Sequence, residues 1–81
     1  MPYEISLERD IDTGLDRYLI VPGEEFDAGD ERELSDWLMA AAQNPTASFA
    51  IDLSNVGEPG EELRAALAVV GAEHLAGLGH A

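Results

Sequence analysis

Alternation of apolar and polar residues predicts two strands near the start of the chain. Residues 3–8 (Tyr-Glu-Ile-Ser-Leu-Glu) alternate with the period of a strand that buries one face. Residues 15–21 end in the aromatic and β-branched run Tyr-Leu-Ile-Val, and Pro22-Gly23 closes this segment. Asp12-Thr13-Gly14 has the composition of a turn. We therefore expect an antiparallel hairpin.

A helix is expected next, after a polar loop over residues 23–29. Asp30 is typical of an N-cap, and Glu33 completes a capping-box pattern with it. Apolar residues recur at helical spacing through residues 34–41, and Asn44-Pro45 stops the helix.

A third strand and a second helix complete the expected fold. Residues 49–54 alternate again, and the intervening helix makes this strand parallel to the second, with a right-handed connection. Residues 57–60 (Gly-Glu-Pro-Gly) form a loop that opens the second helix. The chain is expected to be one compact α+β domain over residues 1–81, with α/β-like connections, order ββαβα and a three-stranded mixed sheet packed with two helices. The stripe of the second helix is Leu63, Leu67, Val70, Leu75 and Leu78, and the expected core is Ile20, Leu34, Trp37, Leu38, Ile51 and Leu67.

Composition adds an extreme charge to this picture. Seventeen acidic residues, four arginines and no lysine give the 81 residues a formal net charge of −13. An apolar content of 46% still indicates a globular domain rather than a disordered acidic tail. The chain has no cysteine, and its first residues lack the basic and apolar regions of a secretion signal. No apolar run is long enough to span a bilayer, so we expect a cytoplasmic protein that does not bind membranes.

The acidic residues are concentrated in the first half of the chain. Seven of them lie between Glu24 and Asp36. Helical residues three positions apart are about 5–6 Å from one another, a spacing comparable to that of phosphates along a nucleic-acid strand. We predict that this surface binds a basic partner. The expected contact residues are Glu24, Glu25, Asp27, Asp30, Glu31, Glu33 and Asp36, with Asp10, Asp12 and Asp16 as a secondary patch.

Two explanations without a partner stay open at this stage. Carboxylates in the first turn of a helix interact favourably with its macrodipole. Adaptation to high salt would also raise the acidic content, but it predicts acidic residues over the whole surface. Only five of the seventeen follow Asp36, which favours one acidic face.

Candidate catalytic and metal-binding patterns are weak. Asp12-Thr13-Gly14 matches the aspartic-protease tripeptide, but the second carboxylate would have to come from a dimer, and a turn explains the same residues. The aspartates around it lack the glycine position and the bidentate glutamate of a calcium loop. His74 and His80 do not share a helical face. We therefore predict a non-enzymatic protein without cofactor or metal, with a dimeric aspartic protease as the distant alternative.

Two local segments resemble a STAS domain, the fold of anti-sigma-factor antagonists, over residues 19–67. Residues 23–28 (Gly-Glu-Glu-Phe-Asp-Ala) resemble the turn after its second strand, and residues 50–56 (Ala-Ile-Asp-Leu-Ser-Asn-Val) resemble its third strand. The resemblance implies a partner-switching module with a phosphorylated Ser or Thr at the start of the next helix. Residues 60–62 offer no hydroxyl there. The contact would centre on residues 54–62.

In overall character the chain also resembles the small acidic inhibitors of phages and mobile elements, including anti-CRISPR proteins that mimic DNA. The Glu24–Asp36 block carries this resemblance. It implies a non-enzymatic inhibitor that blocks the basic nucleic-acid-binding surface of a partner, such as a CRISPR effector complex. Such an inhibitor does not bind nucleic acid itself. The STAS-like interaction module is the alternative.

Overall fold

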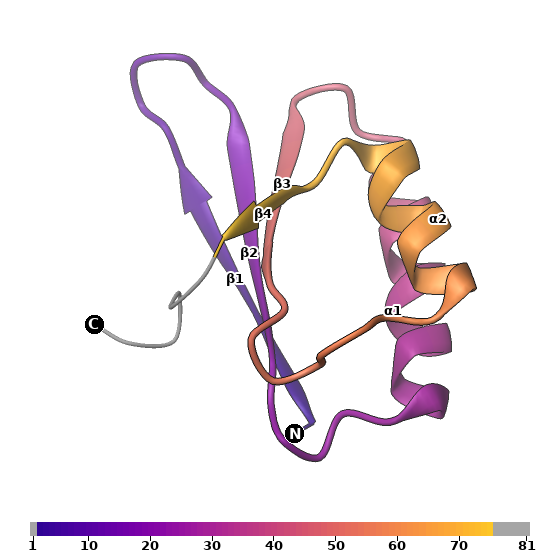
Figure 1. The fold of residues 1–81 in the computed structure, drawn as a ribbon. Coiled ribbons are helices and arrows are strands. Elements are labelled where there is room, and N and C mark those ends of the chain that lie inside the picture. The colour runs from indigo at the N-terminus through magenta and orange to yellow at the C-terminus, as the bar shows by residue number, and fades with distance from the viewer. Residues whose placement is uncertain (1, 76–81) are drawn as a thin grey trace.

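The fold is a two-layer α+β arrangement in which two helices cover one side of a four-stranded mixed sheet (Figure 1). The computed structural model describes residues 2–75. Strand order in the sheet follows the chain, β1-β2-β3-β4. The elements are β1 (Tyr3–Arg9), β2 (Asp16–Pro22), α1 (Ala28–Ala41), β3 (Ala47–Asp52), α2 (Glu61–Val70) and β4 (Glu73–Leu75).

The predicted pairing of the first three strands is confirmed. β1 and β2 form an antiparallel hairpin in continuous register from Tyr3–Pro22 to Arg9–Asp16. β3 runs parallel to β2 after the α1 crossover. Pro22 occupies the last position of β2, beyond the last β2–β3 pair, so its missing N–H leaves no gap in the ladder.

The predicted strand number is wrong, because β4 adds a fourth strand parallel to β3. The second helix was expected to continue through Leu75, but α2 ends at Val70. Gly71 has a φ of 67°, the left-handed conformation that closes a helix, and the Ala72 N–H donates to the Leu67 carbonyl. Leu75 therefore lies in β4, and Leu78 lies outside the described residues.

The start of α1 also differs from the prediction. Asp27, not Asp30, is the N-cap, so the helix begins at Ala28. The Asp27 side chain accepts from the Asp30 N–H at 2.9 Å, and the Asp30 side chain accepts from the Asp27 N–H at 3.1 Å. These aspartates stand three residues apart, and together they make the reciprocal bonds that were assigned to Asp30 and Glu33.

The core lies between the sheet and the two helices. Five of the six predicted core residues are buried, namely Ile20, Leu34, Leu38, Ile51 and Leu67. Trp37 is only half-buried and packs edge-on against Tyr18 and Phe49 at the margin of the core. No helix within residues 2–75 has both the length and the apolar character needed to cross a membrane.

Candidate interaction surface at the helix N-termini

Both helices begin at the same end of the sheet, the end where β2 and β3 terminate (Figure 1). Glu31 in the first turn of α1 joins them, because its Oε1 accepts a hydrogen bond of 2.8 Å from the backbone N–H of Gly60, the N-cap of α2. This contact brings the first turn of α2 beside the acidic block. We call the combined set the acidic end: Glu24, Glu25, Asp27, Asp30, Glu31, Glu61 and Glu62.

Four carboxylates of the predicted contact set stabilise the fold itself. Asp27 and Asp30 form the capping box, and Glu31 holds the N-cap of α2. Glu33 accepts a hydrogen bond of 2.5 Å from the hydroxyl of Tyr3 on β1. Asp30, Glu33 and Asp36 are therefore not a uniform row of free carboxylates.

The capping hydrogen bonds favour the charged form of Asp27. Its pKa is lowered, chiefly because the backbone N–H of Asp30 donates to its carboxylate. A group with a depressed pKa contributes stability above its ordinary pKa, and this contribution is lost as the pH falls. The ionised Asp27 also lies where the α1 dipole is positive.

The other carboxylates of this region remain available to a partner. Among residues 2–75, the side chains of Glu24, Glu25, Asp36, Glu61 and Glu62 have no hydrogen bond or ion pair. All five are exposed.

Within the described part of the chain, no arginine forms an ion pair with a carboxylate of the acidic end. The two ion pairs there are Arg9–Asp16 at 3.0 Å and Arg17–Glu73 at 3.1 Å. The first lies in the β1–β2 hairpin and the second joins β2 to β4. Arg32 on α1 and Arg64 on α2 lie near the helix N-termini and offset part of the negative charge there, so the acidic end keeps a net excess of carboxylates.

A shallow groove of about 250 Å³ runs between α1 and α2. Its apolar rim includes Met39 and Val69, which are 46% and 64% exposed. Asp36 and Glu62 add a carboxylate from each helix, so the groove combines apolar area with negative charge. The groove was not among the features predicted from the sequence; the available signal was two large apolar residues outside the apolar stripes that form the core. The remaining lining residues are Ser35, Ala65 and Ala66.

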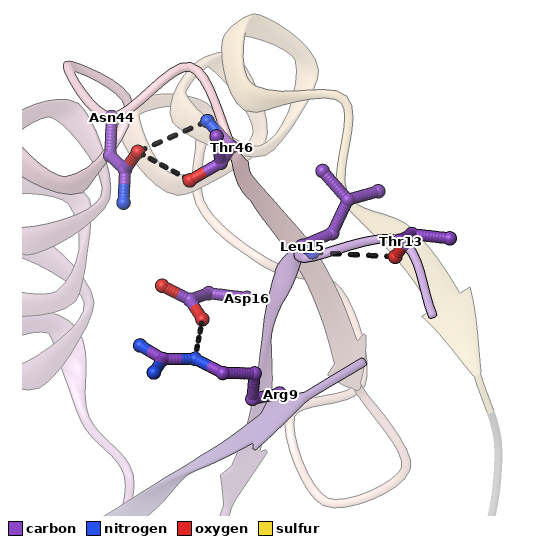
Figure 2. Close-up of polar contacts among 6 residues, drawn as sticks. All are labelled: Arg9, Thr13, Leu15, Asp16, Asn44 and Thr46. Atoms are coloured by element: carbon purple, nitrogen blue, oxygen red, sulfur yellow. Dashed lines mark hydrogen bonds and ion pairs between the residues drawn. The ribbon is translucent and has the colours of Figure 1, made fainter. Parts of the chain in front are cut away.

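The predicted secondary patch lies at the opposite end of the sheet, in the hairpin turn (Figures 1 and 2). Asp10 Oδ1 accepts from the backbone N–H groups of Asp12 and Thr13, and Asp16 pairs with Arg9. Asp12 is exposed in this turn. A hairpin turn is therefore enough to account for the Asp-Thr-Gly tripeptide that matches aspartic proteases. β2 is seven residues long and spans about 20 Å. The secondary patch is therefore separated from the acidic end by about the length of this strand.

The loop over residues 54–62, which is the contact expected of a STAS-like module, follows a buried carboxylate. Asp52, at the end of β3, is 5% exposed. Its Oδ1 accepts from both the backbone N–H and the hydroxyl of Ser54. These bonds form an Asx turn that leads the chain out of the sheet. No group of three or more potential metal ligands occurs within residues 2–75.

Comparison with protein-family models, with curated proteins and with solved structures gives no match for this chain.

The contact between Tyr3 and Glu33 gives a pH prediction. The hydrogen bond to Glu33, followed by burial, raises the pKa of Tyr3 from 10.0 to about 12. The folded state therefore holds the proton more tightly than the unfolded state, so this contribution is complete below pH 10 and is lost between about pH 10 and 12. We expect the free energy of unfolding to fall across this window, as measured by denaturant titration.

The variant Tyr3→Phe keeps the ring contact with Phe26 but lacks the hydroxyl. It is expected to cost about 1 kcal/mol at neutral pH and to lose the alkaline step. Tyr18→Phe is the matched control, because it removes the hydroxyl of the other tyrosine and should keep the step. A Tyr3→Phe protein with the same alkaline step would contradict the assignment.

Proposed function

We propose that the protein is a non-enzymatic acidic binding protein that occupies the basic nucleic-acid-binding surface of a partner, in the manner of phage or mobile-element anti-CRISPR proteins that mimic DNA. It acts in the cytoplasm and does not bind nucleic acid itself. The observation that carries this proposal is the acidic end. The loop before α1 and the first turns of two parallel helices gather seven carboxylates, none of them paired with an arginine in the described chain.

Helix stabilisation accounts for only part of this charge. Asp27, Asp30 and Glu31 satisfy backbone N–H groups, which is enough to cap both helices. Glu24 and Glu25 precede the cap of α1 and make no such bond among the described residues. Their mutual repulsion is offset when they meet a surface of Lys and Arg, as phosphates are.

The groove between the helices supports the same contact. Electrostatic attraction alone gives fast but easily screened binding. Met39 and Val69 add apolar area next to Asp36 and Glu62, so a partner gains burial as well as charge.

A test of this function needs carboxylates that the fold does not use. Reversing Glu31, Glu33 and Asp36 together would also break the bonds to Gly60 and Tyr3. A better variant combines Glu24→Gln, Glu25→Gln and Glu62→Gln. The matched control, on β1 and β4, combines Glu4→Gln, Glu8→Gln and Glu73→Gln, which lie outside the predicted contact set. Each changes the net charge by the same three units.

The experiment is capture from lysate at low salt, elution with a salt gradient, and competition of the captured partner with a labelled DNA duplex. We expect a nucleic-acid-binding protein that releases the duplex when this protein binds. The acidic-end variant should bind at least about tenfold more weakly, and the control should bind like the wild type. Binding that the duplex does not compete with, or equal weakening in both variants, would contradict the proposal.

The STAS-like interaction module is the second candidate, and the Asx turn at Asp52 and Ser54 favours it. These bonds order the start of the loop over residues 54–62, which is the predicted contact of such a module. A contact of this kind is less sensitive to salt than the acidic end. Retained binding at moderate salt together with loss in Asn55→Ala would favour this candidate.

A further inference from the structure

The outer edge of β1 has backbone groups that no described strand uses. β1 is the first strand of the sheet, and β2 is its one neighbour there. In an antiparallel pair, residues alternate between those that bond to the neighbour and those that face away. The Asp10 N–H donates to the Leu15 carbonyl, and the Gly23 N–H donates to the Pro2 carbonyl, which fixes this alternation. The residues whose N–H and C=O groups face outward are Tyr3, Ile5, Leu7 and Arg9.

This edge has only one of the features that usually block strand addition. Natural sheet edges are protected by bulges, prolines, charged side chains or very short strands, and of these β1 has charged side chains alone, at Glu4, Glu8 and Arg9. The β1–β2 register is continuous over all seven residues, and residues 3–9 contain no proline. The opposite edge, β4, is only three residues long. β1 is therefore the edge that can accept a further strand.

The side chains beside this edge specify the chemistry of that strand. Glu4 and Glu8 project from one face of β1 and are exposed. On the other face Ile5 is half-buried and Leu7 is 52% exposed. A hollow of about 510 Å³, lined by residues 3–6, adjoins the same part of the strand.

We propose that β1 accepts an extended segment of a basic partner by antiparallel or parallel strand addition. Residues of the added strand that share a face with Glu4 and Glu8 are Lys or Arg, and the alternating residues, which share a face with Ile5 and Leu7, are apolar. A second copy of this chain is disfavoured, because each copy carries a net charge of −13. This contact is separate from the acidic end.

The probe is a synthetic peptide of alternating lysine and valine, and the readout is amide hydrogen exchange of the whole protein by NMR. Binding should slow exchange at the outward amides of Tyr3, Ile5 and Leu7. The amides of Glu4 and Ser6 should change little, because they already bond to β2. A peptide of the same composition with its lysines in one block is the control for charge alone.

Two exposed apolar residues supply matched variants. Leu7→Lys places a charge beside the edge, and Val69→Lys makes the same charge change on α2. We expect Leu7→Lys to weaken peptide binding about tenfold and Val69→Lys to leave it near the wild-type value.

Three outcomes would overturn the proposal. The first is that the peptide does not bind, and the second is that it binds without protecting the outward amides, which would assign the contact to charge alone. Protection that rises with protein concentration and needs no peptide would assign the edge to a second copy. Because the readout is residue by residue, failure here is distinguishable from failure of the acidic end.

Discussion

Truncating Leu38 to alanine is expected to lower the free energy of unfolding by about 2–5 kcal/mol. Leu38 is fully buried in the core cluster between α1 and the sheet, so its loss removes apolar burial and leaves a cavity. A domain of 81 residues has a total stability of about 4–12 kcal/mol. The variant therefore loses a large fraction of its stability, which denaturant unfolding followed by circular dichroism would measure.

Met39→Ala is the matched control for this truncation. Met39 is the next residue of α1 and is of similar size, but it is 46% exposed at the groove. Its truncation should cost less than about 1 kcal/mol. Similar losses for both variants would contradict the assignment of the Leu38 face to the core.

Replacing Gly71 with alanine is expected to destabilise the protein by about 1–2 kcal/mol. Gly71 ends α2 with a φ of 67°, a conformation that is unfavourable for a residue with a Cβ. A Cβ at this position would have no neighbour within 4 Å, so the cost comes from the backbone and not from a clash. The measurement is again the free energy of unfolding.

Gly29→Ala makes the same chemical change with the opposite expected sign. Gly29 lies in the first turn of α1 without a positive φ, and the added Cβ would be 3.4 Å from Asp27 Oδ1, an ordinary contact. Alanine there restricts the unfolded chain and should stabilise the protein by about 0.5–1 kcal/mol. If both variants were destabilised equally, the left-handed cap at Gly71 would not be the cause.

Much of the fold follows from local patterns. The alternation in residues 3–8, the turn at Asp12-Thr13-Gly14 and the β-branched run before Pro22 correctly predicted the hairpin. The helical spacing of residues 34–41 correctly placed α1 between two parallel strands. These signals are strong because each element buries one face of a regular period.

The features that the sequence did not predict depend on pairing between segments of the chain and not on local periodicity. β4 is three residues long, too short for alternation to be visible, and it exists because the edge of β3 supplies its pairing. α1 begins at Ala28 because Asp27 and Asp30 form the capping box. The sequence leaves open whether Asp27 or Asp30 is the N-cap, since both have the pattern of a helix start.

The sequence by itself determined the net charge, the block between Glu24 and Asp36, and the apolar stripes that build the core. Only the tertiary structure decided which carboxylates belong to the fold and which remain on the surface. Glu31 accepts a hydrogen bond from Gly60, 29 residues away in the sequence, and Glu33 accepts one from Tyr3, 30 residues away. Local spacing in the sequence therefore predicts neither contact. The packing of two parallel helices on one side of the sheet also placed Glu61 and Glu62 beside the acidic block. The physical reason is that charge is a property of composition, whereas the position and the hydrogen-bond partners of each charge are properties of packing.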